Sequence, residues 1–254
     1  MEGKDGMILT VTDFGVAGPY LAQMHAAARL RAPDLPILDL VADLPAFQPV
    51  RAAYLLAALA PEFPAGSAFC CVVDPGVGSD RQALIVQANR QWFVGPDNGL
   101  MAIAAQRDPD AAVWTLDWRP ERLSESFHGR DLFMPTAALL ATGQPVASTP
   151  LDPARMVGAD APPDLAEVVY LDSYGNAMTG LRADTLPADV ELLAGEQRIP
   201  RARTFADVAP GRALWYANSN GLAEIAVNQG RADRDLGLRV GAPVTLHGAP
   251  AGDA

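Results

Sequence analysis

The stretch AFCCVVDPGVGSDRQ, residues 68–82, constrains the fold more than any other part of the chain. Its first six residues are apolar, and the run stops at Asp74, which precedes a Pro-Gly turn. A short apolar run with this ending predicts a buried strand that carries a carboxylate at its exit end. Arg81 stands just before the next apolar run, ALIVQA, so the carboxylate and the guanidinium can face each other across the loop. From these residues alone, the pair suits a catalyst, a metal site or a plain salt bridge.

The net negative charge of the chain limits the kinds of molecule that we expect it to bind. Its 254 residues carry a formal net charge of −11, without the basic face that phosphate binding requires. The longest apolar run, residues 52–60, is too short to cross a bilayer, and the N-terminus lacks a signal-peptide pattern. We therefore expect a cytoplasmic protein that binds a small molecule rather than nucleic acid or membrane. The adjacent Cys70 and Cys71 are expected to be small core residues, because neighbours in a strand point to opposite faces.

Apolar runs with strand character alternate with helical segments in the first part of the chain. We expect strands at residues 7–12, 36–41, 68–73, 83–88, 91–95 and 113–118, and helices at 19–31, 49–60, 100–106 and 135–141. Pro19 and Pro49 fit the first turn of a helix, and Asn89-Arg90 fits a tight hairpin turn. The alternation predicts an α/β domain with a largely parallel central sheet.

The pattern changes after the middle of the chain. Residues 144–164 are rich in proline and alanine without a clear period, which is typical of a linker. Short β-runs separated by turns follow them and predict a smaller, antiparallel, all-β domain that is barrel-like or a sandwich. We therefore divide the chain into an α/β domain at residues 1–150, a linker at 151–164 and a β-barrel domain at 165–254.

Three aspartates, Asp13, Asp74 and Asp97, each follow an expected strand. They are candidates for one site, because ligands of open α/β sheets bind outside the carboxyl ends of the strands. Ordinary turn residues and a three-carboxylate metal site are the alternatives. The sequence has no histidine or cysteine pair with metal-ligand spacing, no phosphate-binding glycine loop and no nucleophile elbow. We therefore expect neither a metal nor a cofactor.

Of the three histidines, only His128 lies in a segment that suggests chemistry. It stands in SFHGRDLF, before an expected Gly-Arg-Asp turn, where a neutral imidazole can orient or deprotonate a water. A structural role for it is equally open, and His25 and His247 are expected to be structural or solvated. Two aromatic residues near loops, Phe47 and Phe205, suit either stacking on a base or the core.

Short motifs occur in a fixed order along the chain. They are TDFG (12–15), VVDPGVG (72–78), GPDNGL (95–100), FHGRDLF (127–133), DSYGN (172–176), TFAD (204–207) and NSNGLAEIAVNQG (218–230). Together they resemble the S-adenosylmethionine hydroxide adenosyltransferase family, whose members are S-adenosylmethionine hydrolases related to fluorinase and chlorinase. The resemblance covers nearly the whole chain, residues 7–245. It implies a homotrimer whose sites lie between the N-terminal domain of one subunit and the C-terminal domain of the next.

The resemblance also implies roles for residues of the first domain. Asp74, Arg81 and His128 match the residues that position a water in the hydrolysing branch. Asp13 matches the acid that holds the ribose hydroxyls, and Phe47 matches a position that packs by the sugar and the methionine. The implied reaction is in-line attack of an activated water at ribose C5′, which converts S-adenosyl-L-methionine to adenosine and L-methionine.

In the second domain, the resemblance implies contacts to both ends of the substrate. Asn176 and Ser219 match contacts to the methionine end. Phe205, Asn228 and Gln229 match the adenine pocket.

Three positions bear on the type of reaction and on the substrate. The resemblance disfavours halide chemistry, because halogenating relatives have Tyr where this chain has Asp74 and Arg where it has Asn220. Many family members carry an acid at the position of Gly18, near the amino group of the substrate, so the recognition of the methionine end stays open. The alternatives are a halide-using adenosyltransferase, a non-catalytic sensor of S-adenosylmethionine or adenosine, and a metal-dependent hydrolase.

Overall fold

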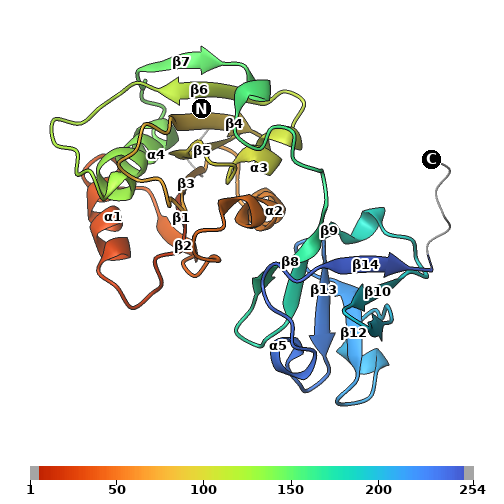
Figure 1. The fold of residues 1–254 in the computed structure, drawn as a ribbon. Helices are drawn as coiled ribbons and strands as arrows, with labels where there is room; N and C mark the ends of the chain where they lie inside the picture. The colour runs from red at the N-terminus through yellow and green to blue at the C-terminus, as the bar shows by residue number, and fades with distance from the viewer. Residues whose placement is uncertain (1–5, 249–254) are drawn as a thin grey trace. The chain divides into compact units, whose positions relative to one another are not determined.

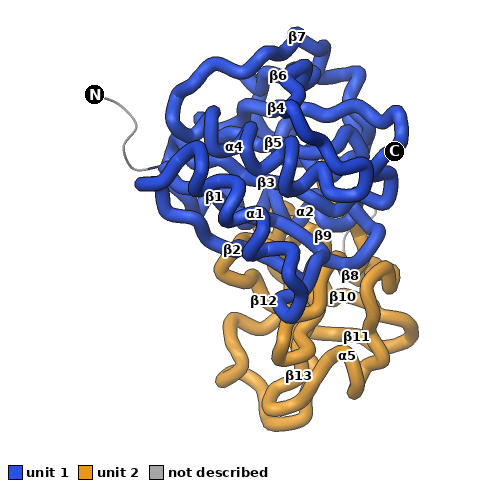
Figure 2. Tube along the Cα trace, turned by 90° about the vertical axis from the view of Figure 1, so that its left-hand side faces the viewer, with its two compact units in different colours: residues 1–161 blue, residues 162–254 orange. Residues whose placement is uncertain are grey.

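The computed structural model describes residues 6–248. The chain forms two compact units, and it passes from the first to the second between Ala161 and Pro162 (Figure 2). We call them the N-terminal unit and the C-terminal unit, and each contains its own hydrophobic core. No helix among residues 6–248 has both the length and the apolar character that crossing a membrane requires.

A seven-stranded sheet forms the centre of the N-terminal unit (Figure 1). Its strands, in spatial order, are β2 (Ile37–Val41), β1 (Ile8–Thr12), β3 (Ala68–Val72), β5 (Gln91–Pro96), β4 (Ala83–Ala88), β6 (Ala112–Leu116) and β7 (Ser148–Leu151). The first four are parallel to one another, whereas the pairings of β4 with β5, β4 with β6 and β6 with β7 are antiparallel. Since β6 again runs in the direction of the first four, the predicted largely parallel α/β sheet is confirmed.

Helices cover both faces of this sheet (Figure 1). On one face lie α1 (Tyr20–Arg29) and α4 (Met134–Ala141), and on the other lie α2 (Pro49–Leu59) and α3 (Ala102–Gln106). α2 begins at Pro49, as predicted for a residue whose missing N–H costs nothing in a first helical turn, whereas Pro19 is the N-cap residue that precedes α1.

The central strand β3 is fully buried, as its apolar run predicted. Cys70 and Cys71 are both buried and unbonded, which confirms them as core residues. The neighbouring strand β5 contains Gly95, where a Cβ would lie 2.3 Å from the carbonyl oxygen of Cys71. Glycine is therefore required at this position for the two strands to pair at their carboxyl ends.

The hairpin of β4 and β5 brings Arg81 to the carboxyl edge of the sheet. Asn89 and Arg90 both have positive φ, 51° and 62°, as a two-residue hairpin turn requires, so the predicted turn is confirmed. Because β4 runs antiparallel to β5, its first residue, Ala83, lies opposite Pro96. Arg81 therefore stands at the edge where the parallel strands end.

The segment around His128 differs from the predicted loop and turn. Gly129–Phe133 forms a π-helical turn that runs directly into α4, and the N–H of Met134 donates to the carbonyl of Gly129. Pro135 has no N–H to donate to the carbonyl of Asp131, so an α-helical pattern cannot continue unbroken through this segment. His128 therefore precedes a helical turn of a type that is frequent at functional sites.

Most of the segment predicted as a linker packs on the N-terminal unit. β7 pairs with β6, and the N–H of Val157 donates to the carboxylate of Asp97 over 2.9 Å. The side-chain amide of Gln106 donates to the carbonyls of Ala159 and Ala161, both at 2.9 Å. These bonds fix a segment whose composition has no period, and the unit extends to residue 161.

The C-terminal unit contains two antiparallel sheets and the short helix α5 (Ala232–Asp235). One contains β12 (Ala213–Ala217), β13 (Leu222–Val227), β9 (Ala177–Arg182) and β8 (Leu165–Leu171), and the other contains β11 (Gln197–Ile199), β10 (Glu191–Ala194) and β14 (Val244–His247). The bridges Glu167–Pro243 and Arg201–Trp215 connect the sheets along both edges. This arrangement confirms the predicted all-β, barrel-like domain.

Candidate active site

The N-terminal unit contains a pocket of about 400 Å³ at the carboxyl ends of β1 and β3. The loops that follow these strands and β2 contribute its lining, together with the segment before the π-helical turn. The lining residues are Asp13, Phe14, Tyr20, Ala46, Phe47, Val72, Asp74, Val77, Ser126, Phe127, His128 and Gly129. Four of the residues singled out from the sequence, Asp13, Phe47, Asp74 and His128, thus lie around one pocket.

Asp74 and Arg81 form a nearly dry ion pair beside this pocket. Nε of Arg81 donates to both carboxylate oxygens of Asp74, at 2.9 and 3.1 Å, and Nη2 donates to Oδ2. The two side chains are only 5% and 12% exposed, respectively. The guanidinium also lies over the ring of Phe133, with 5.2 Å between its central carbon and the ring centroid. These contacts fix the carboxylate in one orientation.

His128 is held by the same guanidinium. Nη2 of Arg81 lies 2.9 Å from Nδ1 of His128. An arginine nitrogen can only donate, so Nδ1 accepts and the neutral imidazole carries its proton on Nε2. Burial, and next the charge of Arg81, lower the pKa of His128 below its ordinary value of 6.5. His128 is therefore neutral at pH 7, and its Nε2–H makes no hydrogen bond to any residue among 6–248.

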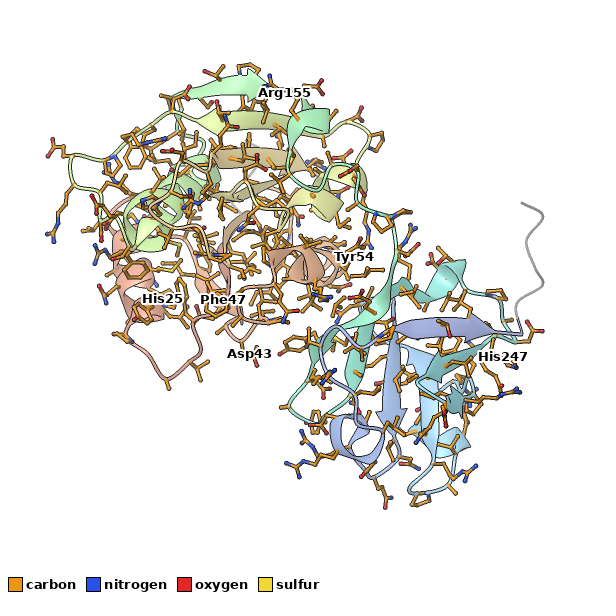
Figure 3. All side chains as sticks on the ribbon, in the orientation of Figure 1. His25, Asp43, Phe47, Tyr54, Arg155 and His247 are labelled. Atoms are coloured by element: carbon orange, nitrogen blue, oxygen red, sulfur yellow. The ribbon has the colours of Figure 1, made fainter. Side chains whose placement is uncertain are left out.

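Asp13 and Phe47 lie on another side of the pocket. The N–H of Phe47 donates to Oδ2 of Asp13 over 3.4 Å. Phe47, on the loop between β2 and α2 (Figure 3), is 75% exposed and has a φ of 62°, which is costly for an aromatic residue. Burial raises the pKa of Asp13, and the negative charge of Asp74 adds to this effect. A carboxylate with free acceptor positions suits a ligand that offers paired hydroxyl groups.

Asp97 does not join these side chains. Its carboxylate accepts the N–H of Val157 and is absent from the pocket lining. The three-aspartate metal site is therefore wrong, since the described part of the chain contains no group of three histidine, cysteine or acidic side chains that could hold a metal. The position of Asp97 directly after a strand correctly predicted that it lies at the edge of the sheet. It did not predict the direction in which the side chain points.

The C-terminal unit contains a second pocket, of about 640 Å³. Its lining residues come from β9, β12 and β13 and from the turns near them. They are Asp172, Tyr174, Asn176, Met178, Phe205, Tyr216, Asn218, Ser219, Asn220, Glu224, Val227, Gln229 and Gly230. Asn176, Phe205, Ser219 and Gln229, which were singled out from the sequence, thus lie around this second pocket.

Asn228, also singled out from the sequence, has another position. Its side-chain amide donates to the carbonyl of Val208 over 2.7 Å, and it is not among the lining residues. It therefore braces the short helical turn Phe205–Asp207, which carries Phe205. The next residue, Gln229, does line the pocket and has a φ of 55°.

Two turns of this pocket are shaped by their own side chains. Asp172 accepts the N–H and the side-chain amide of Asn176, at 2.8 and 3.0 Å. Oδ1 of Asn218 accepts the N–H groups of Asn220 and Leu222, both at 3.0 Å. The polar groups of both turns are therefore fixed before any ligand arrives.

Comparison with known proteins decides the family. The family model for the SAM hydroxide adenosyltransferase N-terminal domain matches residues 8–149, and the model for the C-terminal domain matches residues 166–245. The chain belongs to the SAM hydroxide adenosyltransferase family. The resemblance carried by the sequence motifs is thereby confirmed.

Individual relatives of this family member match over most of their length. A protein of Thermus thermophilus named (R)-S-adenosyl-L-methionine hydrolase is 38% identical, over 93% of this chain and 97% of its own. A protein of Salinispora arenicola with the same name is also 38% identical, over 87% and 90%. Two solved structures, described as an uncharacterized conserved protein of Thermotoga maritima and a conserved hypothetical protein of Thermus thermophilus, have TM-scores of 0.80 and 0.76 at 28% and 35% identity. They cover 94% and 95% of this chain, and 99% and 100% of theirs.

The structure of this SAM hydroxide adenosyltransferase family member also reveals polar residues that our reading of the sequence missed. Tyr216 and Glu224 face each other across β12 and β13, and the Tyr216 hydroxyl donates to Oε1 of Glu224 over 2.6 Å. We did not single out Glu224 in the run LAEIAV. An acid within a buried strand is nevertheless a sequence signal of a functional or paired residue. Burial and the neighbouring Glu224 raise the pKa of Tyr216, which keeps its hydroxyl a donor.

An aromatic cluster in the N-terminal pocket was also missed. Phe14, Tyr20 and Phe127 contact one another with ring centroids 5.5 to 5.9 Å apart. It forms an apolar wall beside Asp13 and His128, because all five residues line this pocket.

The other two histidines lie outside both pockets. Nε2 of His25, on α1, is 2.7 Å from Asp39, which also accepts the hydroxyl of Thr10. His247 lies at the end of β14, and Figure 3 shows both residues. A structural role for His25 agrees with the prediction.

Proposed function

We propose that this protein hydrolyses S-adenosyl-L-methionine to adenosine and L-methionine. One observation carries the proposal: a single guanidinium, that of Arg81, holds both Asp74 and His128 beside a pocket that also presents Asp13. The names of the two relatives described above, both (R)-S-adenosyl-L-methionine hydrolase, support it.

In the proposed reaction, a water oxygen forms a bond to C5′ of the ribose as the bond from C5′ to sulfur breaks. The bonding electrons stay on sulfur, so methionine leaves as a neutral thioether and needs no general acid. The water loses one proton, which Asp74 accepts, while the Nε2–H of His128 donates to the water oxygen. General-base help of this kind supplies roughly 10²–10⁴-fold, and alignment of the reacting atoms about 7–11 kcal/mol more.

The other residues of the two pockets hold the substrate in this proposal. Asp13 accepts the ribose hydroxyls, and Phe47 covers the sugar and the methionine chain. The methionine end contacts Asn176 and Ser219. The adenine contacts Phe205 and Gln229, with Asn228 as their brace.

We further propose that three copies assemble, so that the N-terminal pocket of one subunit and the C-terminal pocket of its neighbour form one site. Exposed apolar side chains around the pockets support this, because such side chains suit an interface: Val16, Tyr20, Phe47 and Val77 in one unit and Tyr174 in the other. Mixing inactive Asp74→Asn and Asn176→Ala variants tests it. Random exchange into trimers restores about one quarter of the sites, whereas sites made within one chain stay inactive.

A cytoplasmic location belongs to the same proposal, since two unpaired cysteines suit a reducing compartment.

Chromatography of the products, with and without chloride and EDTA, tests the reaction itself. We expect adenosine and methionine in every case. Chlorinated adenosine identifies a halide-using transferase instead, loss of activity in EDTA identifies a metal-dependent hydrolase, and tight binding without product identifies a sensor.

A further inference from the structure

Glu224 places a buried carboxylate in the wall of the C-terminal pocket. The residue is only 3% exposed, yet it belongs to the pocket lining. Its oxygens accept the hydroxyl of Tyr216 at 2.6 Å and the side-chain amide of Asn218 at 2.8 Å. Both donors are neutral, so these contacts satisfy part of the carboxylate's hydrogen-bonding capacity without compensating its charge.

The charged side chains that line the C-terminal pocket are all acidic, as far as the structure describes the lining. Its lining, as far as the structure describes it, includes the carboxylates of Asp172 and Glu224 and no lysine or arginine. Arg231 lies behind the turn at residues 172–176, where it donates to the carbonyl of Ser173 over 3.0 Å. Its guanidinium is also paired with Asp233, at 3.0 and 2.7 Å. A pocket of this composition suits a ligand that carries a positive charge.

The carboxylate of Glu224 bonds to residues on two sides of the C-terminal pocket. Through Tyr216 it fixes a ring whose centroid lies 5.2 Å from that of Phe205. Through Asn218 it fixes the turn that carries Ser219. Loss of Glu224 therefore affects both the shape and the charge of the pocket, and an experiment must separate the two.

We propose that Glu224 is a specificity-determining residue, whose charge makes the C-terminal pocket prefer a cationic ligand over a neutral one. This inference rests on the proposed function, in which the substrate has a sulfonium, an ammonium and a carboxylate group and therefore a net positive charge, whereas the product adenosine is neutral. The preference helps the enzyme to bind S-adenosylmethionine in the presence of adenosine, which shares its nucleoside part.

Glu224→Gln separates charge from shape. The amide oxygen still accepts from Asn218, and the amide nitrogen can donate to the Tyr216 oxygen, so the connections survive while the charge is lost. We measure Kd by calorimetry for S-adenosylmethionine and for adenosine, at low and high salt, in proteins that also carry Asp74→Asn, because this change slows the turnover of the ligand during the titration. We expect the Kd for S-adenosylmethionine to rise about tenfold, with a weaker dependence on salt, and the Kd for adenosine to change less than about twofold.

Two further variants complete the test. Glu224→Asp restores the charge and recovers part of the lost affinity for S-adenosylmethionine. Glu191→Gln, in β10 and outside the pocket, is the matched control and leaves both Kd values unchanged. An unchanged Kd for S-adenosylmethionine in Glu224→Gln overturns the inference, and so does equal weakening of both ligands, which indicates a structural role only.

Turnover of the wild type separates this inference from the proposed function. If the wild type binds S-adenosylmethionine but forms no adenosine, the proposed function is wrong, and the Glu224→Gln comparison still decides the inference. If the wild type forms adenosine but Glu224→Gln binds both ligands normally, only the inference is wrong. If the wild type binds neither ligand, both are wrong.

Discussion

The guanidinium of Arg81 donates to the carboxylate of Asp74 and to Nδ1 of His128 at the same time. This shared contact orients both side chains, and it makes Nδ1 of His128 the acceptor, so the neutral imidazole carries its proton on Nε2. In the proposed hydrolysis, the carboxylate of Asp74 is the acceptor and the Nε2–H of His128 is the donor for the attacking water, and both residues line the same pocket.

Asp74→Asn is expected to lower kcat about 10²–10⁴-fold, the usual contribution of general-base help. The side chain keeps its size, so binding of adenosine measured by calorimetry stays within a few-fold of the wild type. Asp97→Asn is the matched control, because that acid also follows a strand but accepts the N–H of Val157 and does not line the pocket. A variant Asp74→Asn that retains more than a tenth of wild-type kcat removes Asp74 from the proposed role.

Arg81→Met is expected to raise the pKa of His128. In the wild type, burial and the positive charge of Arg81 both disfavour the protonated imidazole, so its pKa lies below 6.5. Removing that charge leaves the carboxylate of Asp74, which favours protonation. NMR titration of the His128 ring measures this directly, and an unchanged or lower pKa in the variant shows that Arg81 does not control the imidazole.

Asp13→Asn is expected to raise KM about 10-fold or more, with a smaller change in kcat, since hydrogen bonds to a charged group contribute about 1.5–3 kcal/mol. The pKa of Asp13 is raised above 3.8, so in the wild type KM also rises as the pH falls through that raised value. The neutral Asn side chain cannot titrate, so this pH dependence disappears in the variant. A KM profile that is the same in both proteins contradicts the role of Asp13 at the ribose.

Phe47→Gly is expected to raise KM without loss of stability. The φ of 62° costs an aromatic residue roughly 1–2 kcal/mol, and glycine avoids this cost. The gain offsets the destabilisation that glycine causes through its greater conformational freedom in the unfolded chain. Phe47→Ala loses the ring but keeps the strain of the wild type, so it is expected to raise KM equally and to unfold close to the wild-type temperature. Thermal unfolding and steady-state kinetics test both, and an unchanged KM in the two variants excludes a substrate contact.

The sequence predicted the position of the catalytic candidates better than their geometry. The apolar run of β3 and the Asn89-Arg90 turn are local signals, and together they place Asp74 and Arg81 at one edge of the sheet. The π-helical turn after His128 was missed, because its bonding pattern has no period in the sequence that separates it from a loop.

Other predictions failed where contacts between residues far apart in the sequence determine the position of a side chain. Asp97 follows a strand like the other aspartates, but the N–H of Val157, sixty residues away, holds its carboxylate elsewhere. The acid in the run of β13 could be noticed in the sequence, but its partner Tyr216 follows only from the pairing of β12 with β13. Propensity describes each strand by itself, whereas these contacts depend on which strands become neighbours.

The most direct test of the proposed hydrolysis is turnover of S-adenosyl-L-methionine in ¹⁸O-labelled water, with the products analysed by mass spectrometry. We predict that adenosine carries the label at its 5′ oxygen and that methionine carries none, because water attacks C5′ and the bond from C5′ to sulfur breaks. Adenosine without label, label in methionine, or no adenosine at all contradicts the proposal.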